Sequence, residues 1–330
     1  HRNQIEALLV TGDGQAFAAL AQDPTLARPD VIVEHGEYAY RAQRPLWGYL
    51  AWAGSLGRPD VVGWALAALA VLAAGLACAV CARLLEARSA SPWWALLLLA
   101  IGYESIITLT PELFAFALFG AGLLRWSRGH GATAIALFAA SALTRETMLL
   151  SIAAVALFEL VHADGGLGRR FRQLLPFGWP FLAVLAWDTI LRIRLGSWPV
   201  GGGSEARTSL PFVGLMESFA NALSPGLVVG VVVAVGVCVC ALRYAPRDVL
   251  TWVSIAYALF ATTFSEEVWV HAGFTRNLLP MFVSAFVATL GGLRQRAVQR
   301  GGADARAGTR GLAPLLSTTV SEPAGRAATG

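Results

Sequence analysis

The 330-residue sequence contains no lysine, and only 14% of its residues are charged, whereas an average soluble domain carries about 25% charged residues. Hydrophobic residues make up 56% of the chain. A soluble fold could not hide this much apolar surface, because too few polar residues remain to cover it. The composition therefore excludes an ordinary soluble domain and predicts an integral membrane protein.

The sequence also lacks the motifs of several large enzyme classes. It has no P-loop, no GxSxG nucleophile elbow and no HExxH helix. Its four cysteines lie inside apolar runs without accompanying histidines, which indicates buried thiols that pack between helices: Cys78, Cys81, Cys238 and Cys240. ATP hydrolysis, serine hydrolysis and zinc chemistry are therefore poorly supported.

Hydrophobic runs are abundant along the chain. A membrane helix needs roughly 17 to 25 apolar residues, and the pattern predicts about nine such segments. They lie near residues 61–82, 92–107, 111–125, 131–144, 147–162, 174–193, 225–242, 249–264 and 277–292. The short segments within 92–125 and 131–162 are either full hairpins or broken helices that turn inside the protein. The predicted fold class is all-α, a polytopic transmembrane helical bundle.

Three regions follow from this pattern. Residues 1–60 form an outer juxtamembrane loop with short interfacial helices, and residues 61–292 form the transmembrane domain. Residues 293–330 are rich in small residues and arginine without apolar periodicity, which predicts a disordered tail. The chain opens on His1 and a polar stretch without an apolar leader, so we expect a membrane helix upstream of it.

The arginines predict an orientation in the cell membrane. With residues 1–60 outside, the inner loops hold twelve arginines and the outer connections after the first span hold four. Cytoplasmic loops carry an excess of basic residues, so this orientation is favoured. It places the tail in the cytoplasm and every group of residues suited to chemistry on the extracytoplasmic face.

Two of these outer groups lie before the first span. Asp13 sits between two glycines and precedes Gln15, where a carboxylate can be held at the head of a helix; an N-cap aspartate is the simpler interpretation. Arg41 and Arg44 belong to a Tyr-Arg-Ala-Gln-Arg-Pro-Leu segment of the kind that anchors a chain at the membrane interface or meets a phosphate. Composition alone leaves both alternatives open.

The other two outer groups lie between spans. Arg145 and Glu146 occupy a Thr-Arg-Glu-Thr turn. The last outer loop holds Glu266, Glu267, His271 and Arg276, the last within a Phe-Thr-Arg-Asn-Leu-Leu-Pro segment. A guanidinium matches phosphate oxygens in a fork, which favours an anionic headgroup as ligand. The alternative for each group is a charged, solvated loop.

Charges also occur within or beside the predicted spans, where an isolated charge costs about 2.5 to 3.5 kcal/mol at mid-bilayer. Glu104, Glu112 and Asp188 therefore need partners, water or the membrane edge. Asp188 and Arg192 are four residues apart on one helix, so we expect them to pair. In a transporter, such charges would line a path through the membrane.

Together the four outer motifs, over about residues 11–292, resemble polytopic membrane proteins of the GT-C glycosyltransferase superfamily, in particular actinobacterial members that take part in cell-surface glycopolymer formation. The resemblance implies transfer of a sugar from a polyprenyl-phosphate donor to a glycan or glycolipid acceptor. It implies that Asp13 acts as general base or positions the acceptor hydroxyl. The candidates for holding the leaving phosphate are Arg41, Arg44, Arg145 and Arg276.

The remaining outer residues complete the set of candidate substrate-binding side chains: Gln15, Glu146, Glu266, Glu267 and His271. The lipid-linked sugar is a substrate rather than a cofactor; no cofactor is expected, no metal ligand is assigned, and a divalent metal on outer carboxylates stays open. Membrane lipids are expected partners and nucleic acid is not. A transporter or lipid flippase and a non-catalytic scaffold for envelope assembly remain the alternative functions.

Overall fold

The computed structural model describes residues 14–27, 40, 42–162, 164, 166–196, 198–199, 208–270 and 273–312. This part of the chain is all-helical, and its only β feature is an isolated bridge between Thr208 and Phe264. An all-α fold was predicted, and the described residues confirm it.

The main helices follow one another in chain order. Two lie before the long hydrophobic segments, α2 (Gly14–Gln22) and α4 (Pro45–Gly54). The first half of the bundle comprises α5 (Val62–Glu86), α6 (Leu97–Ile101), α7 (Tyr103–Ile107), α8 (Glu112–Trp126), α9 (Gly131–Thr144) and α10 (Met148–His162). The second half comprises α11 (Leu167–Leu174), α12 (Gly178–Leu195), α13 (Val213–Asn221), α14 (Pro225–Tyr244), α15 (Val249–Ala261), α16 (Glu266–Val270), α17 (Gly273–Asn277) and α18 (Leu279–Leu312).

Three helical stretches are long and apolar enough to cross a membrane: Pro59–Glu86, Gly168–Leu195 and Pro225–Tyr244. Four shorter apolar helices accompany them, namely Pro92–Ile101, Gly131–Thr144, Met148–His162 and Val249–Ala261. Only 17% of the most apolar 18-residue stretch of α14 is buried inside the protein. Such a surface is stable in hydrocarbon and not in water, so the protein is a membrane protein, as predicted.

Local sequence fixes several helix ends. The Ser224 side chain accepts a hydrogen bond from the amide of Leu227, 3.1 Å away, and Pro225 opens α14. Asp248 caps α15 in the same way through the amide of Leu250 at 2.9 Å. Gly196 ends α12 in the left-handed conformation, with φ 75°, which a glycine adopts without steric cost.

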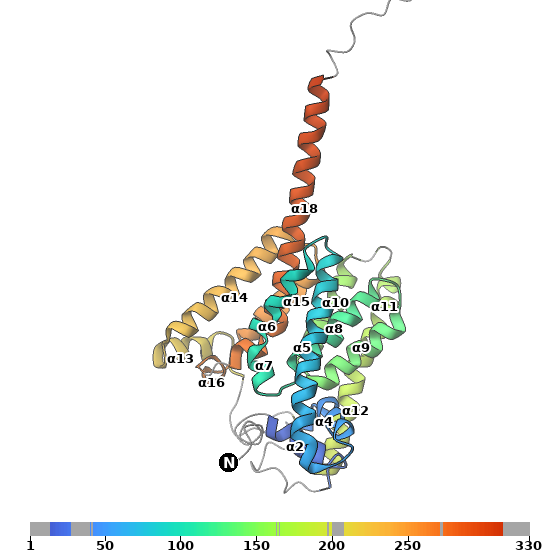
Figure 1. Ribbon diagram of the computed structural model, residues 1–330, viewed down its shortest axis with the longest axis vertical. Helices are drawn as coiled ribbons and strands as arrows, with labels where there is room; N and C mark the ends of the chain where they lie inside the picture. The colour runs from blue at the N-terminus through green and yellow to red at the C-terminus, as the bar shows by residue number, and fades with distance from the viewer. Residues whose placement is uncertain are drawn as a thin grey trace, which may run out of the picture.

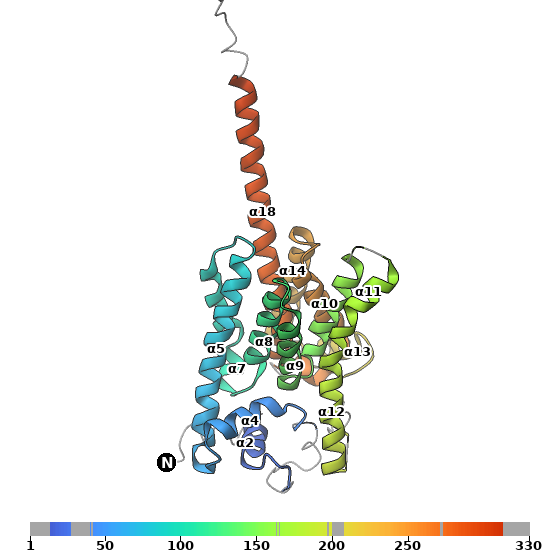
Figure 2. The ribbon, with the colours of Figure 1, turned by 90° about the vertical axis from the view of Figure 1, so that its right-hand side faces the viewer.

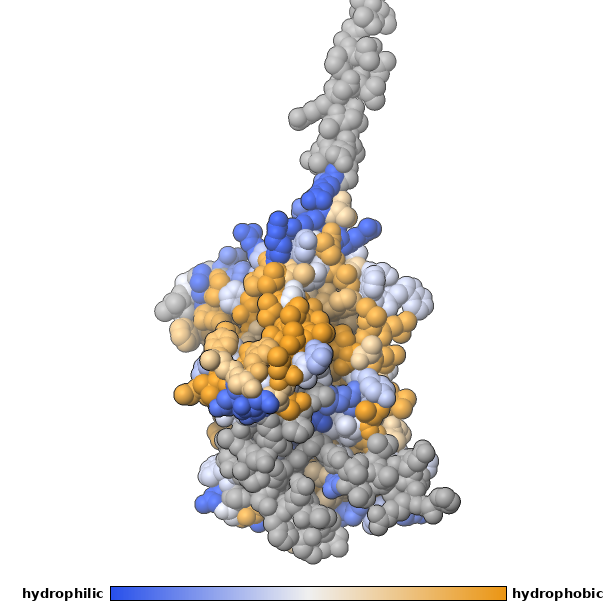
Figure 3. All heavy atoms as spheres, turned by 90° about the vertical axis from the view of Figure 1, so that its left-hand side faces the viewer, coloured by the Kyte–Doolittle hydropathy of each residue, from blue (hydrophilic) through white to orange (hydrophobic). Residues whose placement is uncertain are grey.

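The two ends of the bundle differ. α2 and α4 lie at the end opposite the point where α18 leaves the bundle (Figure 1, Figure 2). Figure 3 shows hydrophobic side chains over the middle of one face and hydrophilic side chains gathered where α18 emerges. α18 continues as a helix to Leu312, through part of the region predicted to be disordered from residue 293; residues 313–330 lie outside the described residues.

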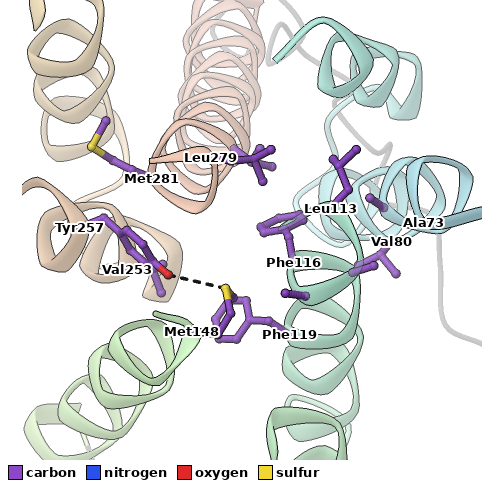
Figure 4. Packing of buried hydrophobic residues seen from close by; sticks show 14 of the residues in the cluster. Ala73, Val80, Leu113, Phe116, Phe119, Met148, Val253, Tyr257, Leu279 and Met281 are labelled. Atoms are coloured by element: carbon purple, nitrogen blue, oxygen red, sulfur yellow. Dashed lines mark hydrogen bonds between the residues drawn. The ribbon is translucent and has the colours of Figure 1, made fainter. Parts of the chain in front are cut away.

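The buried core packs several helices of the bundle against one another. Phe116, Phe119, Met148, Tyr257 and Leu279 are all almost fully buried and come from α8, α10, α15 and α18 (Figure 4). The Tyr257 hydroxyl lies 3.5 Å from the sulfur of Met148 and donates to the carbonyl oxygen of Thr147 at 2.8 Å. This contact fixes the turn between α9 and α10 against α15.

Candidate functional site

Three of the four outer sequence motifs meet at the end of the bundle near α4. Arg44 comes just before α4, Arg145 and Glu146 follow α9, and Arg276 lies in α17. Glu112, the first residue of α8, lies between them. We call Arg44, Glu112, Arg145, Glu146 and Arg276 the arginine cluster.

Arg44 and Glu146 form a bidentate pair. Nε and Nη2 of Arg44 each donate to one carboxylate oxygen of Glu146, both at 2.7 Å. Nη2 also donates to the Tyr40 hydroxyl at 3.1 Å. The side chains are 4% and 19% exposed, so solvent screens this pair little. Glu146 therefore fixes the direction in which the Arg44 guanidinium faces.

Arg145 connects three further segments. Its guanidinium donates to Oε1 of Glu112 and to Oδ1 of Asn277, and its Nε donates to the Thr147 hydroxyl at 3.2 Å. Nε of Arg276 lies 3.5 Å from the same Glu112 oxygen. The side chains of Arg145 and Glu112 are 4% and 2% exposed. One buried carboxylate thus faces two guanidiniums.

The electrostatics of the Arg44–Glu146 pair fix its protonation state. Burial acts to raise the pKa of Glu146, but the charge and hydrogen bonds of Arg44 outweigh it and lower that pKa to about 2. Burial acts to lower the pKa of Arg44, and Glu146 instead raises it well above its usual value. Glu146 is thus ionised at neutral pH and is too weak a base to accept a proton from a hydroxyl.

The segment around Arg44 is fixed to its neighbours by side-chain contacts. Nε1 of Trp47 donates to the carbonyl oxygen of Leu109 at 3.0 Å, which holds α4 against the chain that leads into α8. Nε1 of Trp187 on α12 donates to the carbonyl oxygen of Ala42 at 2.8 Å. Arg44 is therefore positioned from two sides.

Two further polar contacts adjoin the cluster. The Thr275 hydroxyl donates to Oε2 of Glu104 at 2.8 Å and so joins α17 to α7. Nε2 of Gln43 donates to Oδ2 of Asp188 at 3.4 Å. The predicted pair of Asp188 and Arg192 is wrong, because Arg192 instead donates to the carbonyl oxygen of Gly196, the C-cap of its own helix.

Among the predicted substrate-binding residues, Arg44, Arg145, Glu146 and Arg276 come together in the arginine cluster. Gln15 is half-buried in the first turn of α2, a helix that packs on α4. Glu266 opens α16 and accepts a hydrogen bond from Asn221 of α13 at 3.4 Å, so its described contact is with α13 and not with the cluster.

Other predicted residues lie outside the described part of the chain: Asp13, Arg41, His271 and the side chain of Glu267. The prediction of Asp13 as the catalytic residue is therefore not tested by the structure. Sequence reasoning omitted Glu112 and Asn277 from the site. The signal for Glu112 was present, since a carboxylate beside an apolar run needs a partner.

Within the described ranges, no three histidine, cysteine, aspartate or glutamate side chains lie together in a way that could hold a metal ion. The sequence matches no model of a known protein family, and neither the curated proteins nor the solved structures contain a match.

Proposed function

We propose that the chain is a membrane glycosyltransferase of the GT-C type that moves a sugar from a polyprenyl-phosphate donor to a glycan or glycolipid acceptor on the outer face of the membrane. The observation that supports this most is the arginine cluster. Residues from motifs that are 102 and 132 positions apart in the chain meet there in direct contact. Such convergence is typical of a binding site and is not required to anchor separate loops at the interface.

The chemistry of the cluster suits an anionic ligand. Three guanidiniums, those of Arg44, Arg145 and Arg276, come together there beside the carboxylates of Glu112 and Glu146. A phosphate accepts guanidinium hydrogen bonds in a fork, so a lipid phosphate matches the donors gathered in the cluster.

The proposed topology places the cluster outside the cell. The long helices α5, α12 and α14, together with the shorter helices between and after them, give about nine passes through the membrane. Helices such as α8, α9 and α10 are short for a bilayer, and each packs one face against the protein core. The predicted inner loops hold twelve arginines and the outer connections after the first span hold only four. The positive-inside rule therefore puts the end of the bundle with the cluster on the outer face.

In the proposed reaction, the acceptor hydroxyl oxygen attacks the anomeric carbon of the donor sugar. The bond from that carbon to the phosphate oxygen breaks, and its electron pair stays on the phosphate. Arg44, Arg145 and Arg276 stabilise the leaving phosphate, and Glu146 holds Arg44 in place. Asp13, by the resemblance described above, takes the hydroxyl proton.

The test is sugar transfer in membranes that contain the protein, with radiolabelled polyprenyl-phosphate sugars and a cell-wall glycan acceptor. We expect Arg44→Lys and Asp13→Asn each to lower the transfer rate about 100-fold or more, because lysine cannot form the fork and asparagine cannot accept the proton. Arg83→Lys is the matched control, since Arg83 forms an exposed pair with Glu86 in the last turn of α5, at the end of that helix far from α4.

Transfer that survives in Arg44→Lys at the wild-type rate would overturn the assigned role of the cluster. If folded wild-type protein transfers no sugar from any donor, the glycosyltransferase proposal fails. In that case, movement of the lipid-linked sugar across proteoliposome membranes would instead identify a flippase.

A further inference from the structure

Asp188 is a buried carboxylate for which the proposed reaction provides no role. It lies in α12, within a stretch long enough to span the membrane, and is 8% exposed. Its Oδ2 accepts one hydrogen bond, from Gln43 at 3.4 Å. Its Oδ1 is buried, and in the described part of the chain no donor reaches it.

A carboxylate in this position is costly. Buried polar atoms are normally hydrogen-bonded, and ionisable groups within membrane helices are kept mainly where they function. Arg192, the basic residue one turn away, does not neutralise Asp188, because it donates to Gly196. A ligand that supplies a hydrogen-bond donor to Oδ1 would remove this cost.

The surroundings of Asp188 connect it directly to the arginine cluster. Its partner Gln43 immediately precedes Arg44 in the chain, and the neighbouring Trp187 donates to the carbonyl oxygen of Ala42 at 2.8 Å. The ring of Trp187 also meets that of Tyr49 edge-on, with centroids 5.8 Å apart. Asp188 is thus held beside the residue that we assign to the donor phosphate.

The chemistry of this place selects a class of ligand. An ionised carboxylate such as that of Asp188 only accepts hydrogen bonds, whereas the amide of Gln43 both donates and accepts them. A ligand hydroxyl can donate to the carboxylate and also exchange a hydrogen bond with the amide. Aromatic rings with a polar edge lie next to these groups. We propose that Asp188 and Gln43 form a subsite that binds a sugar hydroxyl beside the phosphate held by Arg44, an inference that rests on the proposed function.

The test compares two lipids that differ only in the sugar. We measure binding to the full chain in nanodiscs of a polyprenyl-phosphate sugar and of the same polyprenyl phosphate without its sugar. Binding of fluorescent oligosaccharides of glucose, galactose, mannose and arabinose is measured in the same way. The variants are Asp188→Asn and Gln43→Met. The control is Thr189→Val, an exposed neighbour whose hydroxyl donates to the carbonyl oxygen of Leu185.

We expect Asp188→Asn to weaken a sugar-bearing ligand about tenfold or more, because a site built to hydrogen-bond a hydroxyl loses much of its affinity when one partner is altered. Binding of the sugar-free lipid phosphate should stay unchanged, as should all binding to Thr189→Val. A loss confined to the lipid-linked sugar assigns the subsite to the donor, and a loss confined to the oligosaccharides assigns it to the acceptor.

Equal affinities of wild type and Asp188→Asn for every sugar-bearing ligand would overturn the subsite, as would an equal loss for the lipid with and without its sugar. Gln43→Met provides the same comparison if Asp188→Asn does not fold. Because these measurements need no transfer, a wild-type protein that binds sugars through Asp188 but transfers none would overturn the proposed function alone.

Discussion

The described part of the chain contains two buried or half-buried bidentate arginine–carboxylate pairs, one at each end of the bundle. Near the exit of α18, Arg88 donates to both oxygens of Asp248, at 2.5 and 2.8 Å. At the opposite end, Arg44 donates to both oxygens of Glu146, at 2.7 Å each. The chemistry of the two pairs is the same, so what distinguishes them is their surroundings.

The Arg88 pair is balanced and serves helix ends. Arg88 also donates to the carbonyl oxygen of Leu84 at 3.0 Å, and Asp248 also caps α15. The Arg44 pair instead adjoins Arg145, Arg276 and Glu112, so that three guanidiniums come together at this end. An isolated ion pair is typical of a structural contact, whereas several converging guanidiniums are typical of a site for an anion.

The largest expected effect in this comparison comes from Glu112→Ala. Removal of the carboxylate leaves Arg145 and Arg276 facing each other in a buried setting, so we expect a loss of about 3–5 kcal/mol of stability. The measurement is the unfolding transition in detergent, followed by circular dichroism. Glu86→Ala, at an exposed pair, is the control. If Glu112→Ala unfolds with the same stability as wild type, the cluster does not need its central carboxylate.

The next effect is a pH dependence at Glu146. Its pKa falls from the ordinary value of 4.5 to about 2 on folding, so it stabilises the protein fully above pH 4.5, and this contribution is lost as the pH falls towards 2. The shift corresponds to about 3 kcal/mol. We expect wild type to lose its stability advantage over Glu146→Gln across this range. A constant difference between the two proteins would contradict the ionised pair.

A smaller effect is expected at the opposite end. Arg88→Met should lower stability by about 2 kcal/mol, because it removes charge-assisted hydrogen bonds to Asp248. It should leave binding of a polyprenyl phosphate unchanged, as titrated in nanodiscs. The double variant Arg88→Met with Asp248→Asn should recover part of the lost stability. Weakened lipid binding in Arg88→Met would remove the functional distinction between the two ends.

The smallest effect is expected at Arg58. It forms a pair with Asp60 at 2.7 Å, and both side chains are about two-thirds exposed to solvent. Exposed pairs contribute little, because water and salt screen them. Arg58→Ala should therefore leave the unfolding transition and lipid binding within experimental error. A clear loss of either would show that exposure is a poor guide to the importance of charges in this protein.

The helices could be predicted from the sequence far better than the site. Most predicted apolar segments contain one main helix, because continuous hydrophobic runs specify helices locally in a membrane. The segment 92–107 is instead a broken helix, with a 3-10 turn and two five-residue helices that are separated at Gly102. The arginine cluster depends on contacts between distant residues, such as Arg145 with Glu112, 33 positions away, and with Asn277, 132 positions away. No local pattern encodes which distant groups meet.

Asp188 shows where local reasoning fails. Its spacing of four residues from Arg192 favours a pair along one helix face. The pair does not form, because Gln43 approaches Asp188 from another part of the chain and the last turn of α12 offers Arg192 a carbonyl oxygen. Helix-end chemistry and tertiary contact together outweigh a weak local preference.

The separation of the cluster residues along the chain also has a consequence for biosynthesis. Glu112 opens α8 and Arg145 directly follows α9, so both become available for pairing early, whereas Arg276 and Asn277 lie in α17. Chains are made from the N-terminus, so the cluster stays incomplete until α17 has left the ribosome. A product truncated before α17 would therefore lack the contacts of Arg276 and Asn277 and have an unfinished site.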